Sequence, residues 1–111
     1  MNYQHKDLAD GRWAELSFSE QMANIGSEVE RALKWKEKGN AEYAEKAFYR
    51  ALELFDLTIK FNTNKSAFKE LTRLREGFCG LFTDDNIYNL SAEFLRKYFY
   101  YFTISARKAF R

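Results

Sequence analysis

Apolar residues recur along the chain at intervals of three and four positions, which is the spacing of one face of an α-helix. Four segments show this pattern, and residues that favour turns or helix ends separate them. The first segment begins at Ser17, which fits a capping box with Glu20, and it ends at Gly39. Its apolar stripe consists of Met22, Ile25, Val29, Ala32 and Leu33.

The second and third segments repeat this organisation. We expect Asn40 to cap the second helix, because an asparagine oxygen can accept a free backbone N–H group. The apolar positions of the second segment extend beyond half of the helix circumference, so this helix should contact more than one neighbour. Its stripe is Ala44, Ala47, Phe48, Ala51, Phe55 and Ile59, widened by Leu54, Leu57 and Phe61. After the break "FNTNKS", the third stripe is Ala67, Leu71, Leu74, Phe78, Leu81 and Phe82.

The last segment follows Ser91, a predicted cap, and contains "KYFYYF" with five consecutive aromatic side chains. At about 100° per residue, four of these five rings fall on a broad apolar face. That face comprises Phe94, Leu95, Tyr98, Phe99, Tyr101 and Phe102. Tyr100 falls on the polar side instead, with Ile104 one turn further on. We therefore predict that Tyr100 and Ile104 form an exposed apolar pair.

Four amphipathic helices with short connections predict an all-α fold, an antiparallel up-down-up-down four-helix bundle. The chain has 111 residues, which is the size of one domain. Residues 1–16 lack the helical pattern and are expected to form a mobile N-terminal tail. Residues 17–111 are expected to form the single bundle domain.

Composition narrows the possible functions. The net charge is +2 with both signs interspersed, which gives no general reason to expect a nucleic-acid partner. A single cysteine, Cys79, cannot form an intrachain disulfide and so favours a reducing compartment. The N-terminus lacks the apolar region of a signal peptide, and no apolar run approaches the roughly 20 residues of a membrane span. The sequence predicts a cytoplasmic protein with no membrane partner.

Few residues offer catalytic or metal chemistry. His5 is the only histidine, so cysteine and histidine ligands are too few for a zinc site and no Glu-x-x-His pair exists for a di-iron bundle. Residues 84–86 lack the glycine and closing glutamate of a calcium loop. We predict no catalytic residue, no metal and no cofactor. The alternative is a hydrolase or transferase that uses Glu28, Glu30 or Asp56.

Large side chains on the polar faces of the helices favour an interaction role. Besides Tyr100 and Ile104, Trp35 falls off the stripe of its helix. Tryptophan, tyrosine and arginine concentrate in protein interfaces. We predict a non-enzymatic interaction module, with a homodimer as the simplest assembly. Its predicted interface residues are Trp35, Arg31, Tyr100, Ile104, Arg96 and Arg107. In the alternative, Tyr100 is an ordinary exposed tyrosine and Trp35 packs in a second seam between helices.

Binding of single-stranded nucleic acid is a further alternative, because the last helix is basic. Residues 91–111 carry one acidic side chain, Glu93, and Tyr100 could stack on a base. The basic residues are Arg96, Lys97, Arg107, Lys108 and Arg111. The same charges also suit the C-terminal end of a helix, where the helix dipole favours cations.

Two resemblances extend this interpretation. In "WKEKGNAEYAEKAFYRALELF", the residues at the spacing of a tetratricopeptide repeat are Trp35, Gly39, Ala51 and Phe55. This resemblance implies a peptide-binding helical hairpin over residues 35–61. Most of residues 17–107, with "SEQMANIGSEVERALKWKEKGN" and "AFYRALELFDLTI", resembles a family of small, uncharacterised helical proteins from bacteria and archaea. The second resemblance implies an all-helical, stand-alone domain and no particular activity.

Overall fold

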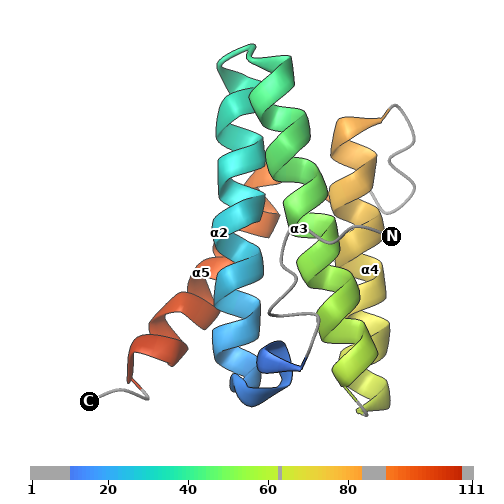
Figure 1. Cartoon of the computed structure of the whole chain (residues 1–111). Helices are drawn as coiled ribbons and strands as arrows, with labels where there is room; N and C mark the ends of the chain where they lie inside the picture. The colour runs from blue at the N-terminus through green and yellow to red at the C-terminus, as the bar shows by residue number, and fades with distance from the viewer. Residues whose placement is uncertain (1–10, 63, 84–89, 109–111) are drawn as a thin grey trace.

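Four long helices, preceded by one short helical turn, make up the part of the chain that the structure describes. This computed structural model describes residues 11–62, 64–83 and 90–108, and none of them forms a strand. The elements are η1 (Arg12–Glu15), α2 (Phe18–Glu37), α3 (Ala41–Phe61), α4 (Lys65–Phe82) and α5 (Ala92–Lys108). The four long helices run alternately up and down (Figure 1). The predicted all-α four-helix fold is therefore confirmed.

Side-chain caps hold the helix ends where the sequence predicts them. The Ser17 hydroxyl accepts the backbone N–H of Glu20, whose carboxylate accepts the backbone N–H of Ser17, so the capping box is present. Asn40 caps α3 and Ser91 caps α5 by accepting backbone N–H groups at 3.0 Å. These bonds satisfy N–H groups that have no partner inside a helix, which defines where each helix begins.

The α2 helix is the central element of the fold. It packs against α3 along most of its length, and α5 crosses it on another side (Figure 1). All five residues of its predicted stripe are buried. The α4 helix lies along α3 and packs on it less extensively. In the core, the ring of Phe55 lies 6.1 Å from the rings of both Phe78 and Phe99, so it joins α3 to α4 and α5.

The expectation that residues 1–16 form a tail is wrong for residues 11–16. Trp13 in η1 is only 1% exposed and belongs to the core. Its indole N–H donates to the Thr58 hydroxyl at 2.8 Å, and its carbonyl accepts the Gln21 side-chain amide at 2.9 Å. The domain thus begins before Ser17, and residues 1–10 lie outside the described part. The sequence pattern could not reveal η1, because a turn of four residues is too short to show a helical period.

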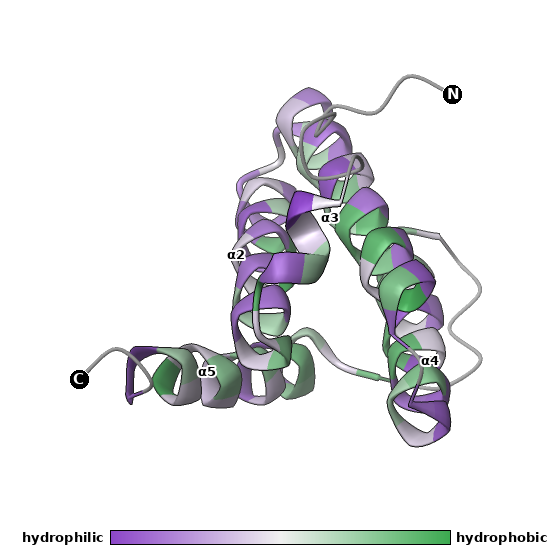
Figure 2. Ribbon diagram, turned by 60° about the horizontal axis from the view of Figure 1, so that its bottom comes forward, coloured by the Kyte–Doolittle hydropathy of each residue, from purple (hydrophilic) through white to green (hydrophobic). Residues whose placement is uncertain are grey.

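The expected breadth of the apolar face on α5 is also wrong. Leu95 and Phe99 are buried, but Tyr101 is 67% exposed and Phe94 is 47% exposed. The physical reason is that α5 lies at the edge of the molecule, with the other helices on one side, and its C-terminal half extends beyond them (Figures 1 and 2). The predicted exposure of Tyr100 and Ile104 is confirmed, at 63% and 38%.

Candidate interaction surface

Exposed apolar side chains concentrate on α5. Seven large apolar residues of the described chain are exposed, and four of them belong to this one helix: Phe94, Tyr100, Tyr101 and Ile104. We define the outer face of α5 as its exposed residues that fall within about 120° of one another on the helix. These are Glu93, Lys97, Tyr100, Tyr101, Ile104, Arg107 and Lys108. The face is apolar at its centre and charged at both ends, which is the composition of many protein interfaces.

A glycine allows α5 to lie close against α2. A Cβ atom at Gly26 of α2 would lie 2.6 Å from the Cβ of Phe99, which is too short for any real contact. The absent side chain at Gly26 therefore lets Phe99 enter the seam between the helices, where it is buried. This close approach fixes which side of α5 is turned inward and, as a consequence, which side forms the outer face.

Arg96 binds α5 to α2 through two carboxylates. Its Nε donates to Glu30 at 2.7 Å, and its Nη1 lies 2.7 Å from Glu37. The hydrogen bond from Arg96 lowers the pKa of Glu37 below its ordinary value, and the positive charge of Arg96 adds to this effect. Arg96 is therefore engaged within the chain, although the sequence-based interpretation placed it at the rim of an interface.

Tyr98 ties the same helix to α4. Its hydroxyl donates a hydrogen bond to the carboxylate of Glu70. Burial of the phenol raises the pKa of Tyr98 above its ordinary value, and the contact with Glu70 raises it further. Together with the Gly26–Phe99 contact and the Arg96 ion pairs, this bond attaches the inner side of α5 to two other helices. The outer face is thereby held in one orientation.

A groove of about 350 Å³ lies between α2 and α5 and reaches the edge of this face. Its lining includes Gly26, Ser27 and Glu30 from α2 and Arg96, Tyr100 and Thr103 from α5. Tyr100 thus borders both the groove and the outer face. A second groove, of about 440 Å³, lies where the α2–α3 turn meets the end of α4, beside the stacked rings of Phe48 and Phe82.

The six residues predicted to form an interface do not share one surface. Trp35 is half-buried, and its ring packs edge-on against Tyr43 with centroids 4.9 Å apart. It therefore contacts the first turn of α3, on a side of α2 away from α5. At 100° per residue, Trp35 and Arg31 lie roughly 100–160° around α2 from Glu30 and Glu37, which face α5.

Tyr100, Ile104 and Arg107 do lie together on α5. The pattern missed Tyr101, because its position is only at the flank of the apolar arc.

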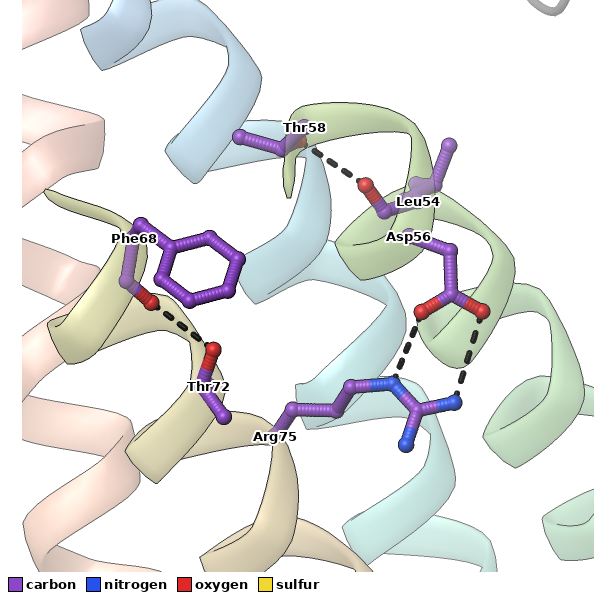
Figure 3. Close-up of polar contacts among 6 residues, drawn as sticks. All are labelled: Leu54, Asp56, Thr58, Phe68, Thr72 and Arg75. Carbon is purple, nitrogen blue, oxygen red and sulfur yellow. Dashed lines mark hydrogen bonds and ion pairs between the residues drawn. The ribbon is translucent and has the colours of Figure 1, made fainter. Parts of the chain in front are cut away.

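The carboxylates considered for catalysis are all engaged in ion pairs. Glu28 pairs with Arg31 at 3.1 Å, and Glu30 pairs with Arg96. Asp56 of α3 receives both Nε and Nη2 of Arg75 of α4, at 2.9 and 3.3 Å (Figure 3). In the described ranges no three histidine, cysteine or acidic side chains gather as a metal site. His5, residues 84–86 and Arg111 lie outside those ranges.

No family model, curated protein or solved structure matches the chain. The resemblance to small helical bacterial and archaeal proteins thus stays a prediction from the sequence pattern. The tetratricopeptide resemblance covers the end of α2, a turn at Gly39 with φ of 77°, and the unbroken helix Ala41–Phe61. One tetratricopeptide repeat consists of two helices, whereas α3 runs through most of this stretch without a break. Within the described residues, no helix is long and apolar enough to cross a membrane.

Proposed function

We propose that this chain is a non-enzymatic helical interaction module that self-associates as a homodimer through the outer face of α5. The observation that carries this proposal is the concentration of exposed aromatic and aliphatic side chains on the one helix that extends beyond the others. Each Å² of apolar surface removed from water contributes about 25 cal/mol, so covering this face favours association. Tyr100, Ile104 and Arg107 keep their predicted role, and Tyr101 joins them.

The support for a binding role rather than catalysis comes from the acidic residues. Glu28, Glu30 and Asp56 each form an ion pair with an arginine of this chain, so we assign none of them a role as general acid or base. We also propose a cytoplasmic location, because Cys79 is a lone, half-buried thiol without a disulfide partner.

The decisive experiment is the mass in solution, measured by light scattering over a concentration series at low and high salt. A mass of two chains that persists at high salt would support an apolar interface. The variant Tyr100→Ser/Ile104→Ser should shift the chain toward monomer while the circular dichroism stays helical. Tyr49→Ser is the matched control, since Tyr49 is 54% exposed on α3 and outside this face. An unchanged mass in the double variant would contradict the proposed interface.

Single-stranded nucleic acid remains a second candidate partner, because Tyr100 and Tyr101 expose adjacent rings that could stack on bases. The basic charge available for phosphates is smaller than the sequence implied. Arg96 is paired with Glu30 and Glu37, and Lys97 lies 3.2 Å from Glu93. Binding through this strip should weaken as salt rises, with a slope of about −0.7 per phosphate neutralised. A fluorescent oligonucleotide titrated at two salt concentrations measures this.

A further inference from the structure

We infer that two copies of this chain pair α5 against α5 in antiparallel orientation, about a twofold axis between Tyr100 and Tyr101. The inference rests on the proposed self-association and adds the orientation and register of the two helices. It follows from how charge is distributed along the outer face of α5.

The two ends of this face differ in charge. Glu93 lies in the first turn of α5, whereas Arg107 and Lys108 lie in the last turn. The exposed apolar residues Tyr100, Tyr101 and Ile104 lie between these ends. A twofold interface brings the same patch of both subunits together, so the patch must be complementary to itself. Lys97 lies one turn after Glu93, so the first end of the face carries one charge of each sign, whereas the last end carries two positive charges. Reversing one copy places Glu93 beside the basic end of the other copy and keeps the two basic ends apart.

The register follows from the centre of the apolar patch. With the axis between Tyr100 and Tyr101, the phenol rings of the two copies meet at the middle. Seven or eight residues toward the N-terminus, Glu93 lies opposite Lys108 of the second copy and beside its Arg107. The same contact occurs at the other end by symmetry, so one pairing places each Glu93 beside a basic end, with Lys97 opposite Ile104 of the second copy.

A parallel pairing would oppose like charges instead. It would set Glu93 against Glu93 and the Arg107–Lys108 end against itself, and like charges at an interface disfavour association. The helix dipoles add to this difference, since antiparallel neighbours bring the positive end of one helix beside the negative end of the other. The charge distribution therefore selects the antiparallel arrangement.

The fold leaves the outer face accessible to a second helix. The other helices lie on one side of α5 (Figure 2), and its inner side is attached through Phe99, Arg96 and Tyr98. Glu93 pairs with Lys97 on its own helix at 3.2 Å, but both side chains are more than three-quarters exposed. Such a pair contributes little, so Glu93 can turn toward a second copy at small cost.

The size of this seam predicts a weak dimer. A helix of 17 residues is about 25 Å long at 1.5 Å per residue. One helix pair of that length buries an area at the low end for specific interfaces, which is typical of concentration-dependent association. Measurements must therefore extend to high protein concentrations.

Charge reversal tests the orientation. Glu93→Lys alone places positive charge against Arg107 and Lys108 at both ends, and Arg107→Glu/Lys108→Glu alone places negative charge against Glu93 at both ends. We expect each variant to dimerise about tenfold more weakly than the unchanged chain in sedimentation equilibrium. The weakening of each variant alone reports the orientation, because a parallel pairing opposes like charges both before and after either change. An equimolar mixture of the two variants should recover the original dissociation constant, because both ends of the mixed dimer are then complementary. Recovery also shows that both variants are folded.

Three other results would overturn the inference in distinguishable ways. If the unchanged chain dimerises and the two variants dimerise as tightly, self-association stands and the antiparallel α5 pairing is wrong. If both variants are weakened and their mixture is no tighter than either alone, the pairing is likewise wrong while self-association stands. If the unchanged chain is a monomer at every concentration, the proposed homodimer fails and the pairing fails with it.

Discussion

Gly26 of α2 and Phe99 of α5 approach so closely that a methyl group on Gly26 would lie 2.6 Å from the Cβ of Phe99. The glycine is therefore required by packing between two helices that are about 70 residues apart in the chain. Since α5 carries the proposed interface, this contact also connects the stability of the fold to the presentation of the outer face.

Gly26→Ala is the first prediction. In an exposed helix, alanine in place of glycine stabilises by about 1 kcal/mol, but here the new methyl group must push α5 away from α2. Overpacking of this kind costs typically 1–3 kcal/mol, so we expect the free energy of unfolding to fall by about 1 kcal/mol. Urea denaturation followed by circular dichroism measures it. Ser27→Ala, at the exposed neighbouring position, is the control and should stay close to the original stability. A gain in stability in Gly26→Ala would contradict the close packing.

Trp13 gives the second prediction. Trp13→Ala should cost about 3–5 kcal/mol, the range for a large buried aromatic side chain, and Trp13→Phe should cost less because it keeps part of the volume. Deletion of residues 1–16 should destabilise to a similar extent as Trp13→Ala, since it removes the same core side chain. Urea denaturation measures the effect of the deletion. If residues 1–16 were a dispensable tail, their deletion would leave the midpoint of the unfolding transition unchanged.

The features that the sequence predicted are local, and those that it missed depend on distant neighbours. The stripe from Met22 to Leu33 and the caps at Ser17 and Asn40 follow from the helical period and from groups within a single turn. The position of Trp13 depends on Thr58, which is 45 residues away. No spacing rule connects two such residues, so the pattern could not place the tryptophan in the core.

The candidate surface shows the same limit. A helical wheel gives the direction of a side chain but not whether a neighbouring helix lies in that direction. Tyr100 was predicted to be exposed because polar residues surround it on the wheel, and this is confirmed. Tyr101 was assigned to the core face, yet α5 extends past the other helices and leaves it uncovered. The partners of Arg96 lie 66 and 59 positions away on α2, beyond any local pattern.

Arg96→Gln is the third prediction, because it removes both ion pairs between α5 and α2. The pairs are partly exposed, so we expect the free energy of unfolding to fall by at most about 1 kcal/mol at pH 7. The pKa of Glu37 is lower in the folded chain than in the unfolded chain. The stabilisation from its ion pair with Arg96 is therefore complete above the unfolded pKa, and it is lost as the pH falls through the folded pKa. The unchanged chain should therefore lose more stability than Arg96→Gln between pH 6 and roughly pH 3.

The measurement is urea denaturation at a series of acidic pH values. Arg73→Gln, at an exposed position of α4 outside the outer face of α5, is the control for removal of one arginine charge. If the two stability curves of the unchanged chain and Arg96→Gln stay parallel across this range, Arg96 does not hold the ionised Glu37 in solution.

Tyr98→Phe is the fourth prediction, and its pH dependence has the opposite sign. The hydrogen bond to Glu70 and the burial of the phenol raise the pKa of Tyr98, so the folded chain keeps this proton at pH values where the unfolded chain releases it. The stabilisation is complete below the unfolded pKa near 10 and declines as pH rises above it. Tyr98→Phe should cost about 1 kcal/mol at pH 7 through the lost hydrogen bond, and the difference from the unchanged chain should shrink above about pH 10.

Tyr101→Phe, which alters an exposed hydroxyl on the same helix, should show neither effect in urea denaturation at pH 7 and pH 10.5. A difference between Tyr98→Phe and the unchanged chain that stays constant with pH would mean that Tyr98 ionises as readily in the folded chain as in the unfolded one.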